Sequence, residues 1–170
     1  VGPFTLARRV VARLDSVGSD DPGTVNINAD VFTKGSQDYF DTQINLNTAR
    51  LDDIGAGGIQ LGNAAGDALR VNGAAGAARV DTSGGAGDID IDATTTLAAD
   101  LTLDSGTDAD QSIDLDRPIN DDANGATPSN LVLNNGGTGA DGVRIDAPIG
   151  NGGASRITSA VAASTSSAMS

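Results

Sequence analysis

The stretch Gly87–Gly106, GDIDIDATTTLAADLTLDSG, contains the pattern that decides the fold. Within it, Ile89–Asp92 and Leu101–Asp104 repeat one unit: an apolar residue, any residue, a second apolar residue, and then Asn or Asp. Side chains alternate between the two faces of a β-strand, so both apolar residues of a unit share a face. Asn or Asp then favours a turn, because its side chain bonds to nearby backbone. Each unit predicts a short strand followed by a corner.

The same unit occurs nine times along the chain, and only Gly62 departs from the pattern at the final position. The copies are Val25–Asn28, Ile44–Asn47, Ile59–Gly62, Leu69–Asn72, Ile89–Asp92, Leu101–Asp104, Ile113–Asp116, Leu131–Asn134 and Val143–Asp146.

Apolar positions also recur at a spacing of 30 residues, which is typical of a solenoid, propeller or array. Two series show it: Ile59, Ile89, Ile119 and Ile149, and Val71, Leu101, Leu131 and Val161. Two or three short strands separated by Gly, Asn, Asp and Ser fit one coil of a parallel β-helix of about 30 residues. Dividing the 170 residues by this period predicts five or six coils. We expect these side chains to point inward: Ile89, Leu101, Leu115, Leu131 and Ile145.

The composition agrees with an all-β solenoid. Aromatic residues make up 2% of the chain and apolar residues 38%. Ladders of Ile, Leu and Val, stacked about 4.8 Å apart, fill a narrow interior without aromatic rings. Helical repeats are disfavoured, because Gly and β-branched residues occur throughout.

The regular pattern divides the chain into three parts: an N-terminal cap or irregular first coil over 1–23, solenoid repeats over 24–161, and a small, polar tail or start of a further coil over 162–170. Two interpretations of the first part stay open. Phe4, Ala7, Val11 and Leu14 lie on one face of a possible cap helix, and the same stretch is also compatible with two further strands.

Composition excludes much enzyme chemistry. The chain has no Cys and no His, and all 23 acidic residues are Asp, so a Ser/His or Cys/His pair is impossible. We therefore expect no enzyme and no catalytic residues. The net charge of −13 would repel nucleic acid and anionic lipid, and no apolar run is long enough to span a membrane.

With these units in place, the chain resembles the β-helical repeats of large secreted bacterial adhesins of the filamentous haemagglutinin type and related autotransporter passengers. The resemblance covers most of the chain from about residue 24 and rests on stretches such as GDIDIDATTTLAADLTLDSG and NLVLNNGGTGADGVRIDAPIGNGG. It implies a secreted or bacterial cell-surface location and a rod used for adhesion, spacing or matrix assembly, with a host-surface or matrix glycan as a partner.

One candidate metal site involves Asp141, Asp116 and Asp146. The segment 136–143, GGTGADGV, fits the calcium-binding β-roll nonapeptide in a single copy, with Asp141 as a ligand. Asp116 and Asp146 share the 30-residue register, so they should stack and repel each other unless a cation such as Ca²⁺ lies between them. Alternation with neutral residues, as in Asp81/Gln111/Asp141, would relieve such repulsion without a metal.

Three adjacent Asp pairs are candidates for acidic clusters like those that β-helical polysaccharide hydrolases use for general acid and base catalysis: Asp20-Asp21, Asp52-Asp53 and Asp121-Asp122. Adjacent strand residues face opposite ways, so we expect these pairs to lie in solvated turns rather than in a catalytic groove.

The leading hypothesis is a structural extracellular segment that acts as a stackable rod or spacer and associates with itself, or with further repeats of a longer chain, by coil stacking. It needs no cofactor. The alternatives are a calcium-binding β-roll-like module and, third, a carbohydrate-binding or carbohydrate-cleaving β-helix.

Overall fold

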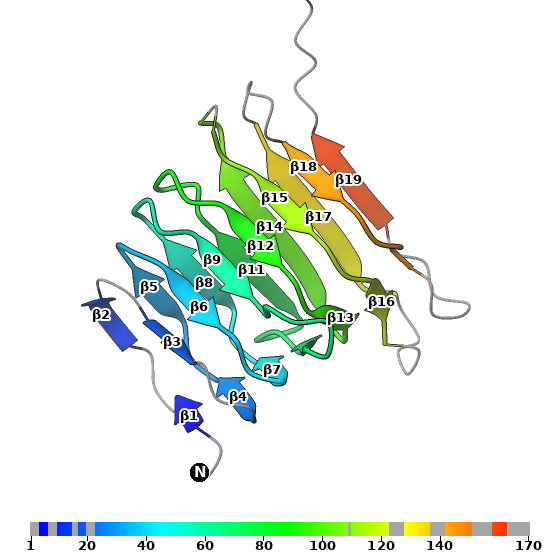
Figure 1. Cartoon of the computed structure of the whole chain (residues 1–170), viewed down its shortest axis with the longest axis horizontal. Coiled ribbons are helices and arrows are strands. Elements are labelled where there is room, and N and C mark those ends of the chain that lie inside the picture. The colour runs from blue at the N-terminus through cyan, green and yellow to red at the C-terminus, as the bar shows by residue number, and fades with distance from the viewer. Residues whose placement is uncertain are drawn as a thin grey trace, which may run out of the picture.

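The computed structural model shows a parallel β-solenoid (Figure 1), and within the residues that it describes 19 short strands form three sheets. It describes residues 4–6, 10–14, 17–19, 23–108, 110–122, 128–136, 142–150 and 158–162, with side chains from residue 23 to residue 150 apart from the gaps in between. The chain contributes one strand to each sheet in turn, and all the pairing between named strands is parallel. The predicted all-β parallel β-helix is confirmed.

Sheet 1 has six strands, in the order β1 (Phe4–Leu6), β4 (Thr24–Ile27), β7 (Gln43–Leu46), β10 (Ala68–Val71), β13 (Thr94–Leu97) and β16 (Ile119–Asp121). Sheet 2 has seven, in the order β2 (Val10–Leu14), β5 (Val31–Thr33), β8 (Arg50–Asp53), β11 (Ala77–Asp81), β14 (Asp100–Gly106), β17 (Asn130–Asn135) and β19 (Thr158–Ala162). Sheet 3 has six, in the order β3 (Val17–Ser19), β6 (Gln37–Tyr39), β9 (Ile59–Leu61), β12 (Ile89–Ile91), β15 (Ile113–Leu115) and β18 (Val143–Ile145).

Each of the nine predicted units lies on a strand, and nearly all of the apolar residues in these units face the interior. Ile89, Leu101, Leu115 and Leu131 are at most 1% exposed. Ile145 is the exception among the five inward predictions: it occupies the inward register of β18, yet it is 42% exposed. Its equivalent one coil earlier, Leu115, is covered by Ile145, whereas Ile145 lies on the outermost strand of sheet 3.

The coil length varies, so the predicted period of about 30 residues holds for only some of the coils. Equivalent residues are 19 apart between Asn26 and Asn45, 25 apart between Asn47 and Asn72, and 30 apart between Asp100 and Asn130. Some pairs that are 30 apart are therefore true neighbours, such as Leu101 and Leu131, but others lie in different sheets. Ile89 pairs with Ile113 in sheet 3, not with Ile119, which belongs to sheet 1.

The interpretation of the N-terminal segment as a cap helix is wrong. Phe4–Leu6 and Val10–Leu14 form β1 and β2, which pair with β4 and β5. The open edges of β4 and β5 offer unpaired backbone groups, and strand pairing satisfies them where a helix could not. Of the predicted tail over 162–170, Ala162 is the last residue of β19, and residues 163–170 lie outside the described residues.

The corner between sheets 2 and 3 is built from glycine because the backbones of successive coils touch there. A Cβ atom on Gly55 would lie 1.6 Å from the carbonyl oxygen of Lys34, and one on Gly85 would lie 1.6 Å from that of Gly55. No side chain fits in such a gap. Glycine at this corner therefore permits the backbones of successive coils to approach each other closely enough for their strands to pair.

Candidate functional site

The three outer faces of the solenoid differ in chemistry. Sheet 1 carries a ladder of asparagines that runs from coil to coil: the Asn47 side chain donates to Asn28 at 2.8 Å, and that of Asn72 donates to Asn47 at 2.7 Å. The sequence pattern predicts that these residues bond to local backbone. Their amides instead join equivalent positions of neighbouring coils, because each amide both donates and accepts and so can repeat along a stack.

Sheet 2 carries arginines between carboxylates. Arg50 contacts Asp52 at 2.9 Å and Asp81 at 2.8 Å, while Arg79 contacts Asp81 at 2.9 Å and Asp104 at 2.8 Å. Asp81 pairs with Asp104 in the sheet, not with Gln111, so the predicted alternation of Asp81 with a neutral residue is wrong. The intervening arginines relieve the repulsion instead.

The ionisation of Asp52 and Asp81 follows from this setting. Burial raises the pKa of Asp52 and outweighs the neighbouring Arg50. Burial also acts to raise the pKa of Asp81, but hydrogen bonds from Ser83 and Arg79 prevail and lower it. Asp81 is therefore a stable anion at the centre of this ion-pair chain.

The two described Asp pairs do not lie in solvated turns, which corrects that expectation. Asp52 and Asp53 end β8 and are 5% and 0% exposed, and Asp121 ends β16 and is 8% exposed. Asp53 accepts hydrogen bonds from the backbone N–H groups of Gly55, Gly57 and Gly58. Those three donors compensate the buried charge. The third pair, Asp20-Asp21, lies outside the described residues.

Sheet 3 carries the candidate metal site, the acidic cluster, which we define as Asp90, Asp92 and Asp116. Asp90 lies on β12, Asp92 follows that strand, and Asp116 follows β15 in the next coil. One carboxylate oxygen from each lies within 4.8 Å of the others. All three side chains are half-buried, and one oxygen each of Asp90 and Asp116 is covered and accepts no hydrogen bond.

Proton affinity is unusually high in the acidic cluster. Burial raises the pKa of Asp90 to about 6, with further contributions from Asp92, Asp116 and Asp114. Burial and the adjacent Asp116 also raise the pKa of Asp92. The compensating groups are Gln60, which bonds to Asp92, Arg117, which acts to lower the pKa of Asp92, and Arg144, which acts to lower that of Asp90. Near neutral pH the acidic cluster therefore concentrates negative charge that these groups compensate only in part, since the pKa values of Asp90 and Asp92 stay raised.

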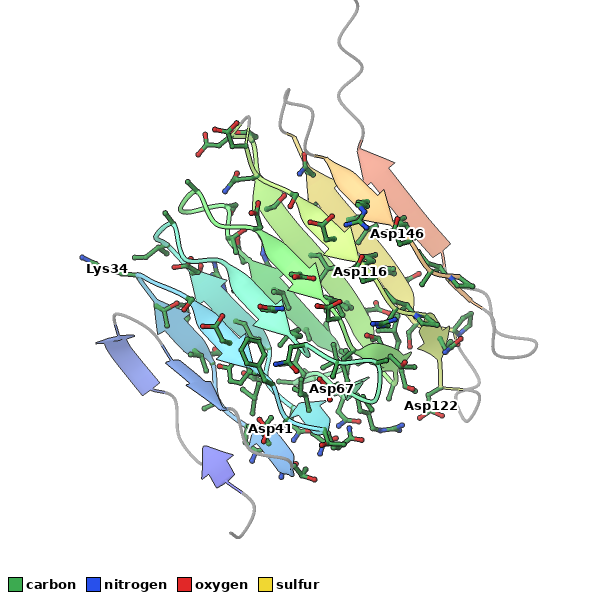
Figure 2. The ribbon with its side chains drawn as sticks, viewed as in Figure 1. Lys34, Asp41, Asp67, Asp116, Asp122 and Asp146 are labelled. Carbon is green, nitrogen blue, oxygen red and sulfur yellow. The ribbon has the colours of Figure 1, made fainter. Side chains whose placement is uncertain are left out.

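Of the predicted metal ligands, Asp116 and Asp146 do lie in neighbouring coils, at the ends of β15 and β18 (Figure 2). Arg144 forms ion pairs with both: one of its nitrogens is 3.7 Å from Asp116 and makes a short contact with Asp146. The hydrogen bond and charge of Asp146 raise the pKa of Arg144. Asp141 lies outside the described residues.

The acidic cluster was missed because the local coil is 24 residues long, as in the bond from Ser112 to Asp88, and the 30-residue register hides the approach of Asp116 to Asp90. The alternating DIDID at Asp88–Asp92 was the signal that could have found it. Three carboxylates supply hard oxygen ligands of the kind that Ca²⁺ takes, but fewer than the six to eight it needs, so water would have to complete the shell.

Comparisons with known proteins identify no relative. No family model, no curated protein and no solved structure matches the chain. Among the described residues there is no helix with the length and apolarity that a membrane span requires. The class of protein is therefore defined by its fold alone, as a parallel β-solenoid with an acidic, polar surface.

Proposed function

We propose that this chain is a structural segment of a secreted or surface-attached bacterial filament or adhesin, in which it acts as a rod or spacer. One observation carries the proposal: the apolar interior is a continuous set of ladders at successive coils. In sheet 2 the ladder runs through Val31, Leu51, Val80, Leu103 and Leu133, each at most 1% exposed. A structure that repeats along one axis gains length by adding coils, which is what a spacer requires.

The surface supports the same proposal. On the outer faces of sheets 1 and 2, polar side chains bond to polar side chains of the neighbouring coil. They form amide ladders on sheet 1 and ion-pair chains on sheet 2. The resemblance to adhesin repeats adds the bacterial surface location and a glycan as the partner of the larger assembly. A non-enzymatic role without a cofactor remains our prediction.

Coil duplication tests the rod function. Leu101 and Leu131 are equivalent, so a second copy of residues 101–130 inserted after Asn130 should add one coil and preserve every ladder. We expect one cooperative urea transition with a larger m value than the parent chain, because more surface is exposed on unfolding. A matched insertion of the same 30 residues in scrambled order is the control. If the duplicated coil unfolds separately or behaves as the scrambled insert does, the chain is not an extensible rod.

The calcium-binding alternative is favoured by the acidic cluster and makes a different prediction. Bound Ca²⁺ would stabilise the folded state, so chelator should lower the melting temperature of the parent chain and leave Asp116→Asn unchanged. For a rod that needs no metal, chelator and millimolar Ca²⁺ should shift both chains equally.

A further inference from the structure

The apolar interior reaches the surface at the β18 end of the solenoid. In the preceding coil, the inward residues Ile113, Leu115 and Ile119 are at most 1% exposed. Their partners in the last described coil are Val143, Ile145 and Ile149, of which Ile145 is 42% exposed and the other two are half-buried. Figure 1 shows β18 and β19 at one end of the stack and β1, β2 and β3 at the other.

We propose that a second copy of this chain docks on this end, with its β1, β2 and β3 continuing the three parallel sheets. The inference rests on the proposed function as a stackable rod and names the partner of that rod. Strand lengths match across the junction: β3 and β18 have three residues each, and β2 and β19 have five each.

The pairing registers specify which residues meet. In sheet 1 one column of paired residues runs without interruption from Phe4 to Ile149. In sheet 3 a column runs from Val17 to Val143, and in sheet 2 another runs from Val10 to Val161. Docking in register therefore places Phe4, Val17 and Val10 of one copy on Ile149, Val143 and Val161 of the other. Each column continues with an apolar residue at the junction.

Continuation of parallel sheets requires a head-to-tail contact, and neither of the two joined segments is acidic. The first 14 residues contain Arg8, Arg9 and Arg13 and no Asp, so of the net charge of −13 this segment carries +3 and the rest of the chain −16. Residues 142–162, which include β18 and β19, contain Arg144, Arg156 and Asp146, so the sequence at neither end of the stack is acidic and the negative charge belongs to the coils between them. The overall repulsion between two anionic copies remains, so added salt should strengthen the association.

Disulfide trapping tests the junction, because the chain has no cysteine of its own. Gly18 and Arg144 are the two ends of the outward column of sheet 3, so docking in register makes them neighbours about 4.8 Å apart, within disulfide reach. The double variant Gly18→Cys/Arg144→Cys should form a ladder of dimers, trimers and longer species on oxidation, which increases with NaCl. The matched control Gly18→Cys/Asn120→Cys places the second thiol on the outer face of sheet 1 and should give no such ladder.

A second variant separates failure of the docking from failure of the rod. Asn26 and Asn45 are paired neighbours within one chain, with their side chains joined at 2.9 Å, so Asn26→Cys/Asn45→Cys should form an intramolecular disulfide in the monomer. If this disulfide forms and the Gly18/Arg144 ladder does not exceed the control, the solenoid stands and the docking is wrong. If neither forms, the coil arrangement is wrong and the proposed function falls with it.

Discussion

The backbones of Gly55 and Gly85 lie against each other, so that a Cβ atom on Gly85 would meet the Gly55 carbonyl oxygen at 1.6 Å. Both residues belong to the corner between sheets 2 and 3, in successive coils. The backbone N–H of Ala86 donates to the Gly55 carbonyl oxygen at 2.8 Å, so the two coils are both hydrogen-bonded and in close contact at this corner.

Gly85→Ala should therefore destabilise the protein by about 3 kcal/mol, because the added methyl group can be accommodated only by separating two backbones. Gly66→Ala is the matched control: its Cβ would meet nothing within 4 Å, and we expect a change within about 0.5 kcal/mol. Urea unfolding measures both. Equal midpoints for the two variants would show that the corner does not hold the coils in contact.

Leu103→Asp should cost more than about 4 kcal/mol of unfolding free energy, because Leu103 is 0% exposed between Val80 and Leu133 and an unpaired charge there has no partner. Thr102→Asp, one residue away on the outer face, should change stability by less than about 1 kcal/mol. Thermal unfolding followed by circular dichroism checks the pair, and similar losses at both positions would contradict the inward register of β14.

Asp90→Asn should stabilise the protein at pH 7 and flatten its pH dependence. The folded state raises the pKa of Asp90 to about 6 from an ordinary value of 3.8, so it binds the proton more tightly than the unfolded chain does. The free energy of unfolding therefore falls as the pH rises between these two values, and the loss is complete above about 6.

Asp38→Asn controls for the removal of one charge. Asp38 lies in the same outward column, but its neighbours there are Gly18 and Gln60 rather than carboxylates. Between pH 4 and pH 8 the melting temperature of Asp90→Asn should stay nearly constant, whereas that of Asp38→Asn should fall as the pH rises. Parallel curves for the two variants would show that the acidic cluster is not under electrostatic strain.

Ala75→Gly should raise stability by about 0.5 to 1 kcal/mol. Ala75 has a φ of 55° in the turn between β10 and β11, where an L side chain is strained by roughly 1 to 2 kcal/mol and glycine is not. The greater freedom of glycine in the unfolded chain offsets part of the gain. Ala74→Gly, next to it without a positive φ, should lower stability slightly, and calorimetry that ranks the two variants in the opposite order would refute the strain.

The strands with two apolar inward residues could be predicted from the sequence, because alternation is visible wherever both positions are Ile, Leu or Val. The strands between them could not. In β5, β6 and β8 the interior also holds Thr33, Gln37 and Asp53, which are at most 1% exposed. Gln37 bonds to the Thr33 hydroxyl and to the Asp52 carbonyl, so these polar groups are satisfied only by residues of the folded coil. No local pattern shows such partners.

The contacts of the candidate site could be predicted only where the coil has the 30-residue length that the sequence pattern indicates. Asp116 and Asp146 were correctly stacked because the coil between them has 30 residues, as does the one between Asp100 and Asn130. The approach of Asp116 to Asp90 required a 24-residue coil, which depends on how far each corner loop extends. The spacing of the apolar residues likewise could not predict that Arg144 forms ion pairs with both Asp116 and Asp146.

The variation in coil length separates the cross-section of the solenoid from its loops. A coil of 19 residues and one of 30 carry the same three-sheet framework, so the extra residues are added at corners and leave every stacked column intact. Insertions and deletions during evolution can thus change the length of the corner loops while the stacked columns stay unchanged. The turn between β10 and β11 is exposed from Ala74 to Ala77. A foreign peptide could therefore be inserted in this turn without changing the stacked columns that stabilise the fold.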